Sequence, residues 1–582
     1  MLTAVREFVL VGDGPGPNGD LPTIDDPRFS MTAGRRSSTL RRTWLDTFDW
    51  RLFRAGLTLE LLAGRGTSEL VLTGRDGELV ASEITSPSSG PPAPAGDPVQ
   101  NGNGRAPSRT PSRTPSRAPS GSAGQRIRWP SLIEDLPVGP LRERLAPVVG
   151  VRALLPVTKV TSVRHELRAL NSDEKTVAVL TVDQMSVASP RHGQPPARLA
   201  VIPLRGYQAQ ATKLADLLEN CEGVAPAAQS PFEAALAAAG RRPGDYTSKI
   251  DVQLSAEMPV ELALATVLQR LFSAVEVNLS GTISDIDTEF LHDLRVAVRR
   301  TRSVLKTAQS VLPASFVARY RPEFKWLGDL TTPTRDLDVY LLGYPSMAAR
   351  LVAATPHELT PFRMHLEEQR AVAHRQLARG LRSTRFKSLA SSWRHDLDHL
   401  VAHPGRKPVT GPFAARRTGK KHEQVLTAGT AIGPASPPQN LHDLRKLCKE
   451  LRYLLEVFAS LHDPAEQWRA VNELKSLQDC LGEFQDTEVQ IAELRAFATQ
   501  MMAAGSAPAE TLLAMGEIAA TLAVRQAKAR AEFAGRFTEF ASPRGRARVG
   551  ALTRDASTAD TPAKSAPAKS TPAKGARPKA AS

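Results

Sequence analysis

Long apolar runs are absent from this 582-residue sequence, and cysteine is scarce. No apolar stretch approaches the roughly 20 residues that a membrane-spanning helix needs, so membrane insertion is not expected. The three cysteines form no Cys-x-x-Cys pair, which excludes a disulfide framework and favours a reducing compartment. The beginning of the sequence lacks the basic and long apolar regions of a signal peptide. We therefore predict a cytoplasmic protein.

Aromatic residues are also few, at 5% of the chain, so stacking platforms for nucleic-acid bases are sparse. The formal net charge is +15, which favours an anionic partner. Hydrophobic residues nevertheless make up 41% of the chain, too many for a wholly disordered basic protein. The length and composition together predict several folded domains that carry an excess of positive charge.

Two segments have a composition that cannot build a hydrophobic core. Residues 85–125 form a Pro/Ser/Arg-rich insert without Leu, Ile or Phe, and residues 551–582 repeat Pro-Ala-Lys. Burial of so few apolar groups cannot offset the entropy of ordering the chain, so both segments are predicted to be disordered. The basic tail is an alternative place for weak, nonspecific contact with nucleic acid, or it only increases solubility.

The first folded region reads as a β domain that the insert interrupts. Residues 41–80 alternate apolar and polar side chains between Gly-rich turns, and the same pattern resumes in KTVAVLTVDQM and RLAVIPLRG. Helical spacing in QATKLADLLE predicts a closing helix. We therefore expect one β domain built from residues 1–84 and 126–222, followed by a linker over residues 223–254.

The stretch WLDTFDWRLFRAGLTLELL in this region resembles the triphosphate tunnel (CYTH) family. The resemblance implies an antiparallel barrel in which carboxylates hold a divalent metal and Lys and Arg hold triphosphate. Glu7 stands where that family has a Lys, and Glu60 and Leu62 stand at two of its Arg positions. We therefore expect a degenerate, noncatalytic domain and assign no catalytic residue, metal ligand or cofactor. A metal-dependent (tri)phosphatase of the CYTH type is the alternative, and Arg164 is a candidate surviving phosphate contact.

Residues 255–550 carry apolar residues at helical spacing and contain an internal repeat at an offset of 150 residues. LHDLRVAVRRTRSVLK, which begins at Leu291, matches LHDLRKLCKELRYLLE, which begins at Leu441, at 7 of 16 positions. A second pair of segments, beginning at Phe324 and Leu474, matches without a gap. The fold class is therefore predicted as α+β and multidomain, with a tunnel-like antiparallel domain followed by an all-α duplicated helical bundle.

Basic side chains in the first motif fall on one strip of the predicted helix. At 100° per residue, His292, Arg295, Arg299, Arg302 and Lys306 span about 80° and border the apolar face. A run of charge on a helix is most often a solvated face, but like charges beside a core repel one another unless an anion lies between them. The strip recurs in the second motif, where Glu456 replaces the last cation. Nearby carboxylates are expected to orient these cations: Asp329, Asp336, Asp338, Asp479, Asp486 and Glu488.

The motifs H-D-L-R-x-x-x-R-R-x-R and H-D-L-R-x-x-x-K-x-L-R-Y, followed by L-x-D-x-L-G and R-D-x-D, resemble the CHAD family. The resemblance implies two pseudo-symmetric helical bundles around a basic channel that binds inorganic polyphosphate, and some members are linked to storage granules. Carried onto matching positions, it implies these ligands: His292, Arg295, Arg299, Arg302, Lys306, His442, Arg445, Lys449 and Arg452. Weaker candidates are Lys325, Lys446, Lys475 and Tyr453, with the basic surface extended by Arg375, Arg379, Arg382, Arg385, Lys528, Arg530 and Arg536.

We therefore predict noncatalytic binding of inorganic polyphosphate between the two repeats. Two other classes of function stay open at this point. One is the metal-dependent triphosphatase in the β domain, and the other is a basic protein associated with nucleic acid or granules.

Overall fold

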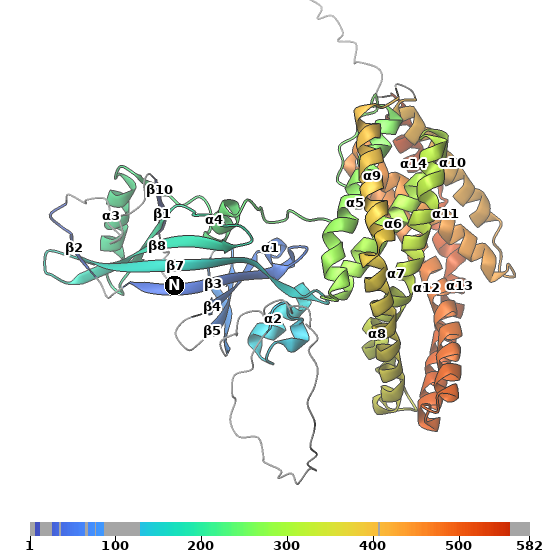
Figure 1. The fold of residues 1–582 in the computed structure, drawn as a ribbon, viewed down its shortest axis with the longest axis horizontal. Coiled ribbons are helices and arrows are strands. Elements are labelled where there is room, and N and C mark those ends of the chain that lie inside the picture. The colour runs from blue at the N-terminus through green and yellow to red at the C-terminus, as the bar shows by residue number, and fades with distance from the viewer. Residues whose placement is uncertain are drawn as a thin grey trace, which may run out of the picture. The chain divides into compact units, whose positions relative to one another are not determined.

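The computed structural model describes residues 6–11, 26–33, 37–63, 68–75, 77–85, 128–405 and 408–558. The chain divides into two compact units, with the boundary between Thr247 and Ser248. The first unit is an antiparallel sheet domain and the second is all helical, as Figure 1 shows, so the predicted fold class is confirmed. The predicted disordered insert lies outside the described residues apart from Thr85, and so does the tail beyond Thr558.

The sheet domain contains ten described strands, hydrogen bonded in the order β10-β1-β9-β8-β7-β3-β4-β5-β6, with β2 paired to β7. The described pairings are antiparallel, as expected for a tunnel-type domain. The strands are β1 (Arg6–Leu10), β2 (Ser30–Ala33), β3 (Ser38–Thr47), β4 (Leu57–Ala63), β5 (Ser68–Gly74), β6 (Leu79–Thr85), β7 (Leu154–Leu170), β8 (Thr176–Ser189), β9 (Arg198–Pro203) and β10 (Val224–Pro226).

Short helices complete this unit, and one of them corrects the predicted linker. They are α1 (Arg51–Arg54), α2 (Pro140–Val149), α3 (Gln208–Glu219) and α4 (Pro231–Ala238). The predicted closing helix is confirmed as α3. Residues 223–254 are not simply a linker, because β10 pairs with β1 and Phe232 and Leu236 of α4 are buried against Trp44 and Trp50. Burial of these apolar side chains is the reason that this segment folds onto the sheet.

The second unit consists of helices joined by short connections. They are α5 (Val260–Ile283), α6 (Thr288–Thr307), α7 (Ala314–Ala348), α8 (Thr360–Arg382), α9 (Thr384–Ala402), α10 (Thr410–Thr430), α11 (Pro438–Val457), α12 (Pro464–Ala503), α13 (Ala509–Phe540) and α14 (Pro543–Thr558). Helix α14 extends into the predicted tail, where Leu552 is buried, so disorder beginning at residue 551 is wrong for residues 551–558. Among the described residues, no helix combines the length and apolar character that a membrane span requires.

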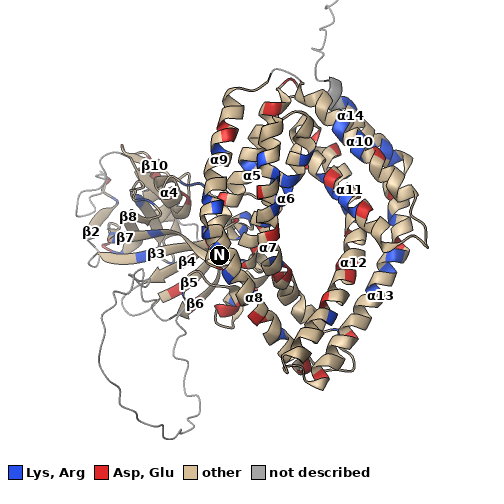
Figure 2. Ribbon diagram, turned by 45° about the vertical axis from the view of Figure 1, so that its right-hand side comes forward, with Lys and Arg blue, Asp and Glu red and all other residues tan. Residues whose placement is uncertain are grey.

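The boundaries of the helices confirm the duplication. Helix α11 begins and ends 150 residues after α6, and α12 begins 150 residues after α7. One buried core is centred on α5, α6, α7 and α9, and another on α11, α12 and the second half of α13. A third core joins the C-terminal parts of α7 and α12 to the N-terminal parts of α8 and α13. Lys and Arg lie along both α6 and α11 (Figure 2), the helices that carry the repeated motif.

Candidate anion-binding site

Helices α6 and α11 hold the basic strips because their apolar faces are fixed in the two cores. The side chain of Asp287 caps α6 by accepting hydrogen bonds from the backbone amides of Glu289 and Phe290. Helix α11 begins with a proline, which suits the first turn because that turn needs no amide donor. The residues of the apolar face are buried in both motifs: Leu291, Leu294, Val298, Leu305, Leu441, Leu444, Cys448, Leu451 and Leu455. The side chains bordering these faces are therefore held at the edge of each core.

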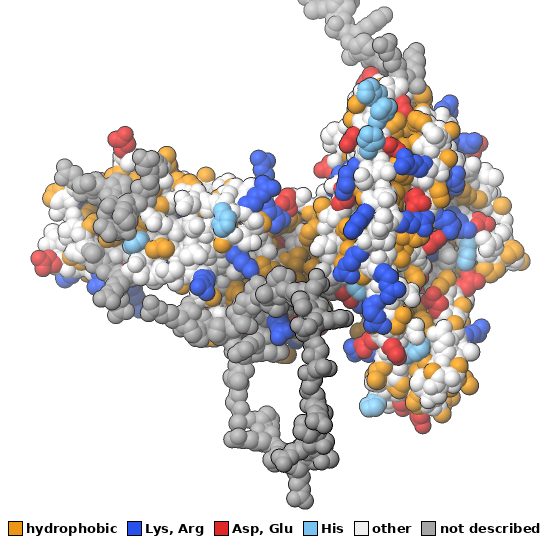
Figure 3. Space-filling view, viewed as in Figure 1, with side chains coloured by type: hydrophobic (Ala, Val, Ile, Leu, Met, Phe, Trp, Pro, Cys, Tyr) orange, Lys and Arg blue, Asp and Glu red, His pale blue; other side chains and the backbone are white. Residues whose placement is uncertain are grey.

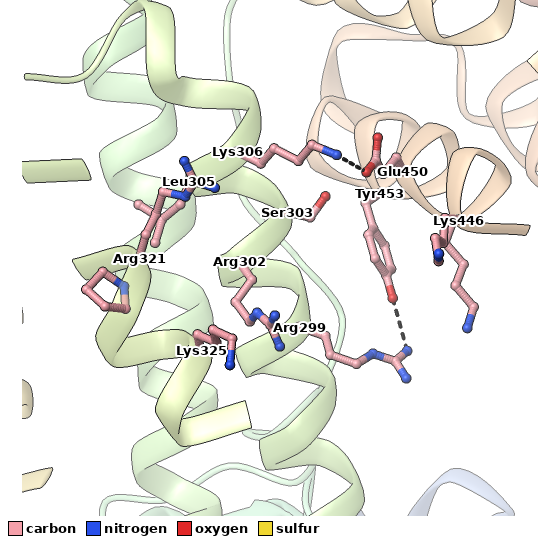
Figure 4. A pocket seen from close by; sticks show the side chains of 12 residues that line it. Arg299, Arg302, Ser303, Leu305, Lys306, Arg321, Lys325, Lys446, Glu450 and Tyr453 are labelled. Carbon is pink, nitrogen blue, oxygen red and sulfur yellow. Dashed lines mark hydrogen bonds and ion pairs between the residues drawn. The ribbon is translucent and has the colours of Figure 1, made fainter. Parts of the chain in front are cut away.

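A cavity of about 580 Å³ lies between α6, α7 and α11, and we call it the cationic cavity (Figure 4). Seven basic side chains and one carboxylate line it. Its residues are Arg299, Arg302, Ser303, Leu305, Lys306, Arg321, Pro322, Lys325, Lys446, Lys449, Glu450 and Tyr453. Such an excess of positive charge in a concave surface attracts anions.

Several of these cations have no partner among the residues that the structure describes. Arg302, Arg321 and Lys449 form no hydrogen bond or ion pair with any residue that the structure describes. Arg299 donates from Nη2 to the hydroxyl of Tyr453 at 3.0 Å, a neutral partner that leaves its charge uncompensated. The guanidinium of Arg302 lies over Gly328 of α7, where a Cβ atom would come within 2.8 Å of Nη1. Donors and charge are therefore available to an oxyanion.

A second cavity, of about 350 Å³, lies between α6, α7, α11 and α12, and we call it the mixed cavity. It is lined by cations and by three carboxylates. Its residues are His292, Arg295, Val296, Arg299, Arg335, Asp336, Val339, Tyr340, Arg445, Lys449, Asp486, Val489, Gln490 and Glu493. Arg299 and Lys449 line both cavities, so the two volumes adjoin at this pair.

The cations at this junction are held at an electrostatic cost. Burial lowers the pKa of Lys449 to about 8, and the charges of Arg445 and Arg299 contribute to that lowering. Burial also lowers the pKa of Arg295, and burial followed by the charge of Arg335 lowers the pKa of His292. A bound anion would relieve the repulsion that these side chains exert on one another.

Comparison with known proteins decides what kind of domain carries this site. Residues 266–495 match the family model of the CHAD domain. The helical unit contains a CHAD domain. The matched residues include α6, α7 and α11 and most of α12, and therefore both cavities.

Individual relatives of the chain are distant. The chain is 28% identical over 232 residues to uncharacterized protein Rv2226 of Mycobacterium tuberculosis, a match of 38% of this chain and 42% of that one. It thus spans less than half the length of this curated relative. Among solved structures, it is similar to the CHAD domain from the plant Ricinus communis, with 24% identity, a TM-score of 0.43, and coverage of 50% and 96% of the two chains. It is also similar to PptA from Streptomyces chartreusis, with 20% identity, a TM-score of 0.39, and coverage of 48% and 100%.

Nine of the twelve predicted ligand residues line the two cavities of the CHAD domain. The cationic cavity brings together Arg299, Arg302, Lys306, Lys325, Lys446 and Lys449, and the mixed cavity adds His292, Arg295 and Arg445. Tyr453, a weaker candidate, also lines the cationic cavity. The strip predicted on each helix is therefore largely gathered at one place.

Three predicted ligand residues do not line either cavity, and the neighbours of each are known. His442 contacts Glu488 at 2.9 Å, and Arg452 lies 3.4 Å from Glu456, the residue that replaces a cation in the second motif. Lys475 lines a separate groove of about 560 Å³ between α12 and α13. These three predicted residues line neither of the two cavities.

Two further cations on the cavities, Arg321 and Arg335, were missed by the sequence analysis. Both belong to α7, and the positions that match them in the second repeat carry Val471 and Gln485. A search for residues that recur in both repeats cannot find them. Two signals were present: α7 places Arg321 one helical turn before the predicted candidate Lys325, and Arg335 begins the R-D-x-D motif.

The carboxylates expected to orient the cations mostly do so. Asp486 lies 3.1 Å from Arg445, and Asp336 lies 4.0 Å from Arg295. The remaining pairs join Asp329 to Lys325, Asp338 to Arg370 and Glu488 to His442. Arg295 is also held by donating from Nη1 to the hydroxyls of Thr331 at 3.2 Å and Thr332 at 2.5 Å.

Basic side chains also cover an outer face of the CHAD domain, along α8 and α9, as the space-filling view shows (Figure 3). Four of the residues predicted to extend the basic surface belong to these two helices: Arg375, Arg379, Arg382 and Arg385. The other three, Lys528, Arg530 and Arg536, belong to α13. One of them, Arg385, pairs with Glu323 at 2.9 Å. These residues line neither cavity.

The charged side chains inside the sheet domain are paired with one another. Arg42 is buried and bound to Glu60 and Asp183, and Arg198 is bound to Glu7. Arg164, the candidate phosphate contact, donates to Asp183 at 3.3 Å. Both carboxylates that replace expected cations, Glu7 and Glu60, are thus neutralised by arginines. The predicted acid-for-base replacements therefore create internal ion pairs.

Proposed function

We propose that this protein binds inorganic polyphosphate, without chemical conversion, in the two adjoining cavities between the repeats of its CHAD domain. The ligands are the nine predicted residues on the cavities together with Arg321 and Arg335. Binding in a cytoplasmic compartment would suit retention of the polymer, including association with polyphosphate or storage granules.

The single observation that carries this proposal is the charge of the cationic cavity. Seven basic side chains surround it against one carboxylate, Glu450, and three of the seven have no partner among the described residues. A linear polymer with about one negative charge per phosphate offers many oxyanions to such a surface, and each contact is a charge-assisted hydrogen bond. Tyr453 is the single aromatic side chain among the residues described as lining this cavity, which disfavours a ligand that binds by base stacking.

The test is a binding titration of the full-length protein with long-chain polyphosphate at several salt concentrations. Reversal of two junction charges, Arg299→Glu with Lys449→Glu, should reduce affinity at least about 100-fold and flatten the dependence of log K on log salt. The matched control is Lys475→Glu with Lys528→Glu, which changes net charge equally in the groove between α12 and α13. That control should bind within about threefold of wild type.

Two outcomes would overturn the proposal. In one, the junction variant keeps a native circular dichroism spectrum and unfolding temperature and binds polyphosphate as wild type does. In the other, both double variants weaken binding equally, which would mean that only net charge matters. Duplex DNA in the same titration separates a polyphosphate site from a general polyanion surface.

We also propose that the sheet domain is noncatalytic. This proposal is supported by the ion pairs that Glu7 and Glu60 form with Arg198 and Arg42, because these arginines and carboxylates already satisfy each other. Release of phosphate from tripolyphosphate in the presence of Mg²⁺ or Mn²⁺ would contradict it, provided that Arg42→Ala abolished the release.

A further inference from the structure

The two adjoining cavities differ sharply in charge. The cationic cavity has one carboxylate among its described lining residues, Glu450, whereas the mixed cavity has three: Asp336, Asp486 and Glu493. The excess of positive over negative side chains therefore falls as a ligand passes the junction of Arg299 and Lys449. The electrostatic attraction on an anion is therefore weaker in the mixed cavity than in the cationic cavity.

The mixed cavity lies where equivalent residues of the two repeats face each other. Five of its positions on α6 and α7 have their equivalents 150 residues later on its α11 and α12 side, and three of the five are identical: Arg295 with Arg445, Arg299 with Lys449, Asp336 with Asp486, Val339 with Val489, and Tyr340 with Gln490. The two repeats are joined here by the Tyr340 hydroxyl, which donates to the Gln490 carbonyl at 2.9 Å. The carboxylates thus occupy both walls of the mixed cavity.

These carboxylates compensate part of the positive charge of the mixed cavity. Asp486 lies 3.1 Å from Arg445, and Asp336 lies 4.0 Å from Arg295 with about half of its side chain exposed. Glu493 interacts with Tyr340 and with the charge of Asp336. A polyanion in this cavity must displace or approach three carboxylates, against one in the cationic cavity.

We propose that Asp336, Asp486 and Glu493 set a chain-length threshold, so that short phosphate chains occupy the cationic cavity alone and only longer chains extend past Arg299 and Lys449. This inference rests on the proposed function and adds a specificity role for the carboxylates. Short chains fit entirely where the charge is highest. Longer chains cross the junction only because their first segment is already bound.

The protonation behaviour of the carboxylates agrees with this arrangement. Burial raises the pKa of Asp336, and burial together with the charge of Asp336 raises the pKa of Glu493. The folded protein thus holds two carboxylates that interact with each other, where additional negative charge is disfavoured.

The test compares tripolyphosphate with long-chain polyphosphate on full-length protein carrying Asp336→Asn with Glu493→Gln. Both substitutions keep the size of the side chain and remove its charge. We expect long-chain affinity to rise at least about threefold while tripolyphosphate affinity changes less than about 1.5-fold. The matched control is Asp479→Asn with Glu532→Gln in the groove between α12 and α13, which should leave both affinities unchanged.

The outcomes separate the inference from the function on which it rests. An equal rise for both ligands, or no rise for the long chain, overturns the chain-length role while polyphosphate binding by wild type still supports the proposed function. If wild type binds neither ligand, the proposed function fails and the inference fails with it. A change of more than a few degrees in unfolding temperature would be followed by repeating the titration with each single substitution, for which the same pattern is required.

Discussion

Lys306 of α6 donates from Nζ to Oε1 of Glu450 on α11 at 2.5 Å, and this ion pair is one half of a reciprocal arrangement. The residue that matches Lys306 in the second repeat is Glu456, and it accepts from Arg300 at 2.7 Å. Arg300 in turn matches Glu450. Each repeat therefore contributes both positions to the contact, with cations in the first copy and carboxylates in the second. The two ion pairs, Lys306 with Glu450 and Arg300 with Glu456, thus join α6 of the first copy to α11 of the second.

Removal of the Glu450 charge should therefore lower the stability of the domain and raise its affinity for polyphosphate. Glu450 also accepts from Lys421 at 2.7 Å, so Glu450→Gln leaves two cations without their carboxylate. We expect the free energy of unfolding to fall by about 1–2 kcal/mol. Polyphosphate affinity should rise by about threefold, because Lys306 becomes available and the cationic cavity loses its carboxylate. Denaturant unfolding and a binding titration measure the two effects.

Exchange of the charges provides the control. Lys306→Glu with Glu450→Lys restores an ion pair across the repeats but sets Lys421 against a second lysine, so it should recover only part of the lost stability. It also replaces Lys306, a proposed ligand, so affinity should not rise above wild type as it does in Glu450→Gln. A lower affinity in Glu450→Gln would contradict this prediction. It would mean that Glu450 orients Lys306 toward polyphosphate and does not compete with polyphosphate for Lys306.

The second prediction concerns pH and follows from Lys449. Its pKa in the free protein is lowered to about 8, below the ordinary value for lysine, so the side chain loses charge as pH rises through 8. A bound polyanion favours the charged form and raises this pKa. Binding therefore takes up a proton near pH 8, and affinity falls as pH rises from about 7 to about 9. Calorimetry at about pH 8 in buffers of different ionisation enthalpy measures the proton uptake directly.

The arginine variant tests whether Lys449 is responsible. A guanidinium at this position would remain charged throughout the range, so Lys449→Arg should bind with an affinity that changes little between about pH 7 and about pH 9. The proton uptake near pH 8 should disappear in the same variant. Persistence of the full pH dependence in Lys449→Arg would assign it to another group, and the lowered pKa of Lys449 would then have no consequence for binding.

The sequence predicted the helices and the basic strips better than it predicted their surroundings. Period and motif repetition place Arg299 and Lys449 on equivalent faces, and in the structure both residues line both cavities. A helical wheel gives the direction of a side chain but not the neighbouring helix that it meets. Lys475 is equivalent to Lys325 in the repeat, yet α13 packs beside its side of α12 and forms a separate groove.

Charge compensation was equally hard to foresee, because it depends on residues distant in sequence. The sequence shows that Glu456 interrupts the second strip, but only the fold reveals that Glu456 binds Arg300 and lies beside Arg452. Arg452 therefore shares the carboxylate of Glu456 with Arg300, although its counterpart Arg302 has no ion pair among the described residues. A duplicated motif thus predicts equivalent geometry without predicting equivalent chemistry.

The last prediction concerns Gly328, over which the Arg302 guanidinium lies. A Cβ atom at this position would come within 2.8 Å of Nη1 of Arg302, and the flexible end of that side chain can move aside. Alanine favours a helix over glycine by about 0.5–1 kcal/mol, so Gly328→Ala should not destabilise the domain appreciably. It should nevertheless weaken polyphosphate binding by about three- to tenfold, because Arg302 is displaced from the cationic cavity.

Gly343 supplies the control on the same helix, since a Cβ atom there would have nothing within 4 Å. Gly343→Ala should bring the same gain in helix stability without altering affinity. A titration and a thermal melt on each variant give both quantities. Equal affinities for the two variants would show that the position of Arg302 is unimportant for binding, whereas a loss confined to Gly328→Ala would show that a glycine in α7 determines where an arginine of α6 meets its ligand.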